Sequence, residues 1–183
     1  VEVLRELIDY SIYKYNKYYS ESYMGTSFQL YSKYTYSDVC RILEWERDEV
    51  PLNIGGYKYD KTTNTYPVFI NYHKEEDIAD TIKYEDRFIS NSRLIAISKS
   101  NRTTESDDVQ YALRSEQLGI KMHLFVRKNK DDKTSKEFYY LGRIKPTGQT
   151  EDIIMADNKT KAVEIFYNLV TPIREDLYDY IIK

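Results

Sequence analysis

The order of β-forming and helical segments constrains the fold of this chain most strongly. Residues 65–72, 122–126 and 137–142 are rich in β-forming residues, and residues 162–170 alternate between apolar and polar side chains. Helical patterns lie between these segments, but without the regular strand–helix–strand rhythm of a parallel sheet with crossover helices. The sequence therefore predicts an α+β fold with a curved, barrel-like and mostly antiparallel sheet flanked by helices.

The first residues predict a helix that precedes the main domain. Apolar side chains three to four residues apart over residues 1–20 are typical of an amphipathic helix. A length of 183 residues is sufficient for one domain with a sizeable core. We therefore expect a linker or packing helix at residues 1–26 and one folded domain at residues 27–183.

Three further helices and one hairpin are expected within that domain. A short helix begins with Ser37 as its N-cap, a longer one covers residues 104–118 with Gly119 as its stop, and a last one covers residues 174–182. Residues 55–72 begin with two glycines and continue with an alternating pattern, a turn-like stretch and a run of β-forming residues. This pattern predicts a β-hairpin.

Charge and composition exclude several classes of protein. The 27 Lys and Arg against 30 Asp and Glu give a net charge of −3, so any contact with nucleic acid must be local. One cysteine and two histidines cannot build a four-ligand zinc site, and the sequence has no serine-nucleophile elbow and no phosphate-binding glycine loop. Asp157-Asn158-Lys159 is more typical of a turn than of a metal-dependent nuclease. With no membrane span or signal peptide visible, we expect a cytoplasmic protein that holds no metal and contacts no membrane.

A local cluster of basic and polar residues offers a surface for a phosphate backbone. Residues 87–104 contain four basic residues and no acid, together with many hydroxyl and amide side chains. Basic side chains supply charge, and hydroxyls and amides supply hydrogen bonds to phosphate oxygens. The residues expected to contact the DNA backbone are Arg87, Ser98, Lys99, Ser100, Asn101 and Arg102. A second basic stretch, residues 127–136, is equally compatible with a solvated loop.

Aromatic and acidic side chains precede this basic segment. Most of the 20 tyrosines are expected to pack in the sheet and core, and a few are candidates for a pocket. An extruded cytosine stacks between rings and donates its N4 amine to a carboxylate. The candidate pocket consists of Gly55, Gly56, Tyr57, Tyr72, Tyr84, Glu85 and Asp86. In it, Tyr57 and Tyr72 are the expected stacking rings, Glu85 or Asp86 accepts the N4 amine, and the glycines allow close approach of the backbone.

Several short motifs occur in order along residues 27–183. They are Leu30-Tyr31-Ser32-Lys33-Tyr34-Thr35, Asp38-Val39-Cys40-Arg41-Ile42-Leu43-Glu44-Trp45, Asn53-Ile54-Gly55-Gly56-Tyr57-Lys58, Tyr84-Glu85-Asp86-Arg87-Phe88, Ser98-Lys99-Ser100-Asn101-Arg102-Thr103, His123-Leu124-Phe125-Val126-Arg127-Lys128, Phe138-Tyr139-Tyr140-Leu141-Gly142 and Asp176-Leu177-Tyr178-Asp179-Tyr180. Together they resemble the C-terminal domain of a group of bacterial superfamily 2 helicases, many of which also carry a phospholipase-D-like nuclease domain. This group includes the SauUSI-like type IV, modification-dependent restriction enzymes.

The resemblance implies an SRA-like (SET- and RING-associated) or PUA-like fold. It also implies binding of 5-methylcytosine or 5-hydroxymethylcytosine in duplex DNA by base flipping, in the service of phage defence. The implied partners are modified duplex DNA and the helicase and nuclease domains of the same polypeptide. The domain itself is expected to be non-catalytic and free of cofactor, with ATP and Mg²⁺ used elsewhere in a full-length restriction endonuclease.

A protein-interaction domain is the alternative from a different class. In that interpretation the domain docks on the helicase or on a partner protein, and its tyrosines pack an interface. The two interpretations differ in one observable property, because only the first expects a preference for a duplex that contains a modified cytosine.

Overall fold

The fold is built on one curled sheet. The computed structural model describes residues 1–18, 22–47, 49, 54–72, 85–128 and 135–183. Seven strands form a sheet with the order β2-β5-β6-β7-β4-β3, and β1 pairs with β6 outside this path. The strands are β1 Lys33–Tyr34, β2 Thr65–Tyr72, β3 Arg87–Ser90, β4 Arg93–Ile97, β5 Lys121–Lys128, β6 Phe138–Ile154 and β7 Lys161–Leu169. The pair β2–β5 is parallel and the other described pairs are antiparallel, which confirms the predicted fold class.

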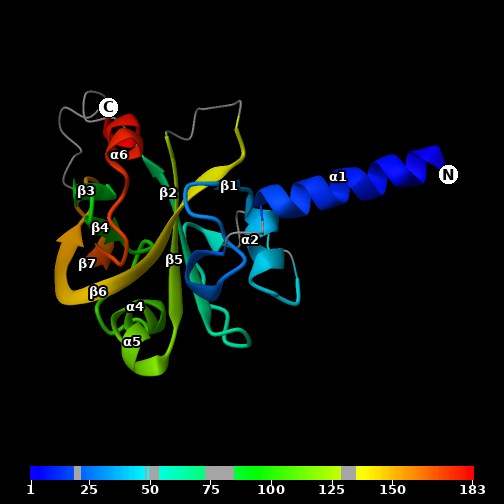
Figure 1. The fold of residues 1–183 in the computed structure, drawn as a ribbon. Helices are drawn as coiled ribbons and strands as arrows, with labels where there is room; N and C mark the ends of the chain where they lie inside the picture. The colour runs from blue at the N-terminus through cyan, green and yellow to red at the C-terminus, as the bar shows by residue number, and fades with distance from the viewer. Residues whose placement is uncertain (19–21, 48, 50–53, 73–84, 129–134) are drawn as a thin grey trace.

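The long strand β6 gives the sheet its curvature. Its first part pairs with β5 and its second part with β7, and the register with β7 shifts between Pro146 and Thr150. Figure 1 shows β6 sweeping around one side of the domain, so that the sheet forms a half-barrel. The sequence predicted only residues 137–142 of this strand. That boundary is wrong because Gly142 adopts a φ of +92° at an irregular step and the strand continues beyond it.

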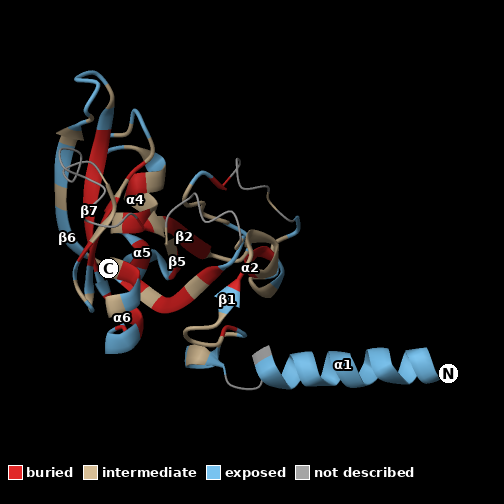
Figure 2. Cartoon of the chain, turned by 90° about the horizontal axis from the view of Figure 1, so that it is seen from above, coloured by how far each residue is buried: buried red, intermediate tan, exposed pale blue. Residues whose placement is uncertain are grey.

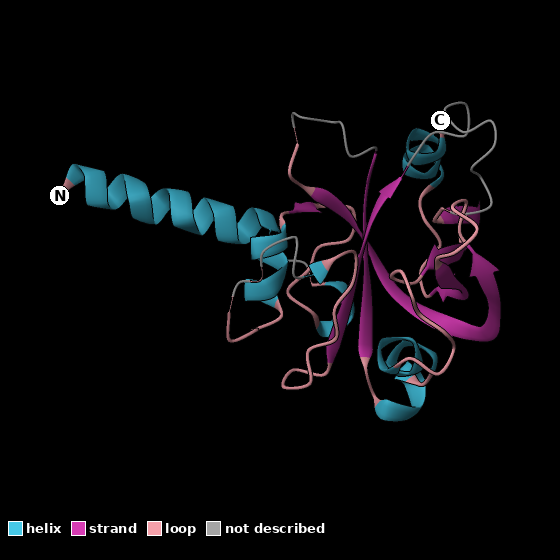
Figure 3. Cartoon of the chain, turned by 180° about the vertical axis from the view of Figure 1, so that it is seen from behind, coloured by secondary structure: helices cyan, strands magenta, loops and turns pink. Residues whose placement is uncertain are grey.

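Five α-helices accompany the sheet among the described residues. They are α1 Glu2–Tyr18, α2 Tyr36–Ile42, α4 Asp107–Leu113, α5 Ser115–Leu118 and α6 Glu175–Ile182, and a 3-10 helix covers Tyr23–Gly25. Figures 1 and 3 show α4 and α5 at one end of β5 and α6 near the opposite end of the sheet. The predicted helix at residues 104–118 is in fact two helices, because the backbone leaves helical geometry at Arg114.

The start of α2 differs from the prediction by two residues. The N-cap is Thr35 rather than Ser37. The Thr35 hydroxyl accepts from the backbone N–H of Asp38, and the Asp38 carboxylate accepts from the backbone N–H of Thr35. This reciprocal capping box satisfies two backbone donors at once, whereas a cap at Ser37 would satisfy one.

Helix α1 is confirmed as a helix, and it carries its apolar side chains on the surface. Residues 1–17 are all exposed, and Leu4, Ile8 and Ile12 keep half or more of their area in solvent. Figure 2 shows the exposed helix extending away from the half-barrel. No helix in the described part of the chain is long and apolar enough to cross a membrane. The function of residues 1–26 as a linker stays a prediction.

Two clusters of buried side chains form the core. The larger one fills the half-barrel and includes Val68, Leu94, Leu124 and Ile165. The smaller one, which includes Phe28, Phe125 and Tyr140, is largely aromatic. Several tyrosines are therefore structural, as the composition led us to expect.

His123 is the buried titratable group of the aromatic cluster. Its exposed fraction is 1%, and its Nδ1 lies 2.9 Å from the Tyr140 hydroxyl. Burial, assisted by the positive charge of Arg143, lowers the pKa of His123 to about 3. The ordinary pKa in an unfolded chain is about 6.5, so the unfolded state binds a proton between these values and the native state does not. The contribution of His123 to stability is therefore present above pH ~6.5 and is lost as the pH falls toward 3.

Replacing His123 by Gln is expected to remove this pH dependence. From pH 7 to pH 5 the free energy of unfolding of the wild-type protein should fall by about 2 kcal/mol more than that of His123→Gln. Glutamine is neutral throughout this range and its amide can bond to the Tyr140 hydroxyl. Urea unfolding of both proteins at the two pH values measures the difference. Equal losses in both proteins would show that His123 takes up a proton over the same pH range in the native and unfolded states.

Candidate functional site

A cavity lies where the two ends of the curled sheet approach each other. Its volume is about 160 Å³, and its walls come from the glycine turn before β2, from β2, from β4 and from β7. The lining residues are Gly55, Gly56, Tyr57, Tyr66, Val68, Phe69, Ile70, Asp86, Ala96, Ile97, Ser98, Lys99, Ile165 and Tyr167. The inner wall is largely apolar, and Asp86, Ser98 and Lys99 bring polar groups to it. The curvature of the sheet therefore creates a small site with few polar groups.

The two predicted glycines form one wall of this cavity. Gly56 has a φ of +92°, a backbone conformation that L side chains rarely adopt. Its carbonyl accepts a hydrogen bond of 2.6 Å from the backbone N–H of Phe69, and Tyr57 forms an isolated bridge with Val68. The predicted hairpin is thus present, although its first arm pairs with β2 only through isolated bridges. The turn places the Tyr57 ring beside the cavity.

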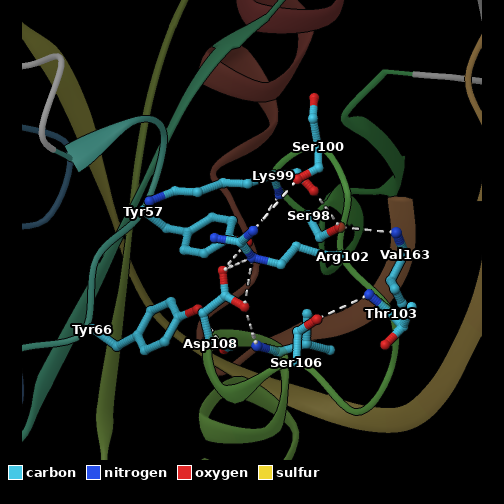
Figure 4. Close-up of polar contacts among 11 residues, drawn as sticks. Tyr57, Tyr66, Ser98, Lys99, Ser100, Arg102, Thr103, Ser106, Asp108 and Val163 are labelled. Carbon is cyan, nitrogen blue, oxygen red and sulfur yellow. Dashed lines mark hydrogen bonds and ion pairs between the residues drawn. The ribbon is translucent and has the colours of Figure 1, made fainter. Parts of the chain in front are cut away.

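The hydroxyl of Tyr57 joins three segments of the chain. It accepts a hydrogen bond of 2.9 Å from the backbone N–H of Lys99 and donates one of 2.9 Å to the Asp108 carboxylate (Figure 4). The Lys99 ammonium lies 4.8 Å from the centroid of the Tyr57 ring. Burial raises the pKa of Tyr57 and lowers the pKa of Lys99. Direct contacts therefore hold the Tyr57 ring next to Lys99 and Asp108.

Tyr66 is the second cavity tyrosine, and the sequence analysis missed it. Its ring stacks on Tyr57 with a centroid distance of 5.6 Å, and its hydroxyl donates to the backbone carbonyl of Asp108. The prediction chose Tyr72 instead, which lies on the same face of β2. Tyr72 is 4% exposed, belongs to the main core cluster and packs against Phe88. Alternation identifies the face of a strand but not which residue along it reaches a cavity.

Of the two predicted acids, Asp86 lines the cavity. Its Oδ1 accepts a hydrogen bond of 2.7 Å from the backbone N–H of Ile97, which orients the carboxylate. Glu85 lies outside the cavity wall, and its Oε2 is buried without a hydrogen-bond partner among the described residues. Tyr84, the remaining predicted pocket residue, lies outside the residues that the structure describes.

The predicted DNA-backbone residues fall into two groups. Arg87 forms a two-bond ion pair with the buried Glu164, at 2.8 and 3.3 Å, and the Ser98 hydroxyl accepts from the backbone N–H of Val163. These two side chains have intramolecular partners within the fold. Ser100 and Asn101 are exposed on the turn after β4. The sequence analysis described residues 87–104 only as a basic and polar segment, and it predicted neither this turn nor β3 and β4 before it.

Arg102 lies beside the Tyr57 hydroxyl network. Its Nε donates to both oxygens of Asp108, at 3.0 and 2.8 Å, and about a third of its side chain is exposed. These hydrogen bonds raise the pKa of Arg102. Asp108 was not among the residues that the sequence predicted for the site, and its link to Tyr57 crosses 51 residues. No local pattern reveals such a contact.

Comparison with solved structures defines the class of fold. The chain is similar to the SRA domain of SUVH5 in complex with hemimethylated CG DNA, with 9% identity, a TM-score of 0.51 and coverage of 80% of this chain and 91% of that chain. It is also similar to KRYPTONITE in complex with mCHG DNA and S-adenosylhomocysteine (SAH), with 7% identity, a TM-score of 0.55 and coverage of 90% and 38%. The modification-dependent restriction endonuclease AspBHI gives 11% identity, a TM-score of 0.49 and coverage of 78% and 77%. The similarity to the SUVH5 domain shows that the fold is SRA-like.

Residues 28–181 match the family described as a domain of unknown function, DUF3427, and the chain belongs to this family. A search of curated proteins finds no match.

Proposed function

We propose that this domain recognises 5-methylcytosine or 5-hydroxymethylcytosine in duplex DNA by taking the extruded base into the cavity between β2 and β4. The observation that carries this proposal is a cavity of about 160 Å³ that combines the Tyr57 ring with the Asp86 carboxylate. A cavity of about 150 Å³ is known to hold a benzene ring, so one pyrimidine ring is of fitting size. The similarity of the fold to the SRA domain of SUVH5 in complex with hemimethylated CG DNA, and to KRYPTONITE in complex with mCHG DNA, supports it.

Asp86 is suited to read the exocyclic amine of cytosine. The hydrogen bond from Ile97 fixes the orientation of the carboxylate. A carboxylate has about four acceptor positions, so it can accept the cytosine N4 amine as well. A thymine presents a carbonyl at that position and would be disfavoured. Asp86 would thus make the cavity prefer cytosine over thymine.

The apolar wall is suited to the 5-methyl group. Val68, Ile70, Ala96 and Ile165 line the cavity and are 1–7% exposed. Burial of one methyl group contributes about 0.8 kcal/mol, which corresponds to about a fourfold preference over unmodified cytosine. The expected discrimination is therefore modest.

Lys99 links base stacking to binding of the backbone. Its ammonium now lies over a face of the Tyr57 ring, so a base that stacks on this face takes the place of the ammonium. A cation–π contact at a partly exposed site is worth about 0.5–1 kcal/mol, which a salt bridge to a phosphate can offset. Ser100 and Asn101, exposed on the same turn, would contact the same strand.

The domain would then supply selectivity to a larger restriction enzyme. ATP hydrolysis and DNA cleavage, with their ATP and Mg²⁺, would reside in helicase and nuclease domains of the same polypeptide, in the cytoplasm. The domain itself would bind without catalysis. This arrangement fits the net charge of −3, because most of the sequence-independent affinity for DNA would come from the other domains.

The direct test of this function is equilibrium binding to matched duplexes. Fluorescence anisotropy compares one duplex with a central 5-methylcytosine, the same duplex with 5-hydroxymethylcytosine, and the unmodified duplex, at 50 and 150 mM salt. We expect about fourfold tighter binding to the methylated duplex at both salt concentrations. Equal affinity for all three duplexes would favour the protein-interaction domain, whose supporting observation is the exposed apolar face of α1.

A further inference from the structure

One carboxylate, that of Asp108, connects the Tyr57 ring beside the cavity to Arg102. Asp108 lies at the start of α4, and its Oδ2 accepts hydrogen bonds both from the Tyr57 hydroxyl, at 2.9 Å, and from Arg102 Nε, at 2.8 Å (Figure 4). Its Oδ1 accepts from Arg102 Nε at 3.0 Å.

The contact with Asp108 holds the hydroxyl end of the Tyr57 ring in place. The Tyr57 backbone is anchored by its bridge to Val68, and its hydroxyl is anchored by Lys99 N–H as donor and by Asp108 as acceptor. The hydroxyl end of the ring cannot move away from this position without breaking these hydrogen bonds. A stacking ring that is held in position loses less entropy on binding than a mobile one.

The same contact restrains a cation at the rim of the cavity. The side chain of Arg102 is 36% exposed and that of Asp108 is 24% exposed, so the pair lies at the surface next to Lys99. An arginine bonded to a carboxylate presents less net charge and fewer free donors to a phosphate than an unpaired arginine. The pair therefore lowers attraction for any DNA, whether modified or not.

We infer that Asp108 is a specificity-determining positioning residue, which holds the Tyr57 ring ready for a modified base and restrains Arg102 from indiscriminate binding to phosphates. This inference rests on the proposed function. It assigns to Asp108 no contact with the base. Asp108 acts through its two partners, and its two effects are separable because one needs an acceptor and the other needs a negative charge.

Two substitutions separate these effects. Asp108→Asn keeps an oxygen that can accept from the Tyr57 hydroxyl but loses the charge that neutralises Arg102. We expect it to steepen the slope of log K against log salt by about 0.9 for the unmodified duplex, as one additional phosphate contact would, and to retain most of the methyl preference. Asp108→Ala should show the same steeper slope, and its preference should fall from about fourfold to about one.

The matched control is Asp107→Asn, an exposed acid in the same turn of α4. It removes the same charge from the same helix, and we expect both the salt slope and the preference to stay at the wild-type values. Thermal unfolding of all four proteins verifies that they are folded. An unchanged slope in Asp108→Asn together with a retained preference in Asp108→Ala would overturn the inference while leaving the proposed function intact. Absence of any preference in the wild-type protein would instead overturn the proposed function.

Discussion

Replacing Arg87 by Met is expected to lower the free energy of unfolding by about 3–5 kcal/mol. Arg87 bonds through two nitrogens to Glu164, which is 3% exposed on β7. Removing the arginine leaves a buried carboxylate without its cation. An unpaired buried charge lowers the free energy of unfolding far more than the loss of a surface ion pair does. The change should be visible as a lower midpoint in urea unfolding.

Two comparison variants make this stability measurement specific. Arg93→Met removes an exposed arginine from the neighbouring strand and should change the free energy of unfolding by no more than about 0.5 kcal/mol. The double variant Arg87→Met/Glu164→Met replaces the whole pair by apolar groups and should recover much of the loss. If Arg87→Met were as stable as the wild type and instead weakened binding to every duplex, Arg87 would be a phosphate contact after all.

Replacing Tyr57 by Ala is expected to weaken binding of the methylated duplex by about 5- to 150-fold. Stacking of one base on an aromatic side chain is worth about 1–3 kcal/mol, which converts to this range. The unmodified duplex should be affected less, because its cytosine gains less from entering the cavity. Anisotropy titrations with the two duplexes measure both changes.

Further tyrosine variants separate stacking from other roles of the ring. Tyr57→Phe keeps the stacking surface but loses the hydrogen bonds to Lys99 and Asp108, so its affinity should lie between those of the wild type and Tyr57→Ala. Tyr111→Ala removes a ring that contacts Tyr59 and does not line the cavity, and it should bind like the wild type. Wild-type affinity in a folded Tyr57→Ala protein would remove Tyr57 from the proposed binding surface.

Much of the fold could be predicted from periodicity, whereas most of the site could not. The long strands β2, β5 and β7 were recognised because each has a run of β-forming residues with consistent faces. Strands β3 and β4 have only four and five residues and lie within residues 87–104. They were not predicted because this segment was interpreted from its basic and polar residues. Short strands that are stabilised by their neighbours carry little signal of their own.

The complete lining of the cavity could not be predicted, because segments that are distant in the sequence contribute to it. Of the residues that the sequence predicted for a pocket, Gly55, Gly56, Tyr57 and Asp86 line one cavity, and their role in binding stays a prediction. The sequence could not show that the half-barrel brings Lys99 next to Tyr57. The ion pair of Arg87 was equally hidden, since Glu164 lies 77 residues away. Sheet curvature, which sets these distances, has no simple sequence pattern.

The most direct test of base recognition is whether the modified cytosine leaves the helix. A 2-aminopurine placed next to 5-methylcytosine reports the loss of stacking through its fluorescence, because an extruded neighbour leaves one of its faces uncovered. We expect the fluorescence to rise when the wild-type protein saturates the methylated duplex. We expect little rise with a folded Ala96→Leu protein, whose added side-chain atoms would fill the cavity of about 160 Å³. Unchanged fluorescence in the saturated wild-type complex would show that the modified cytosine stays stacked in the helix and is not taken into the cavity.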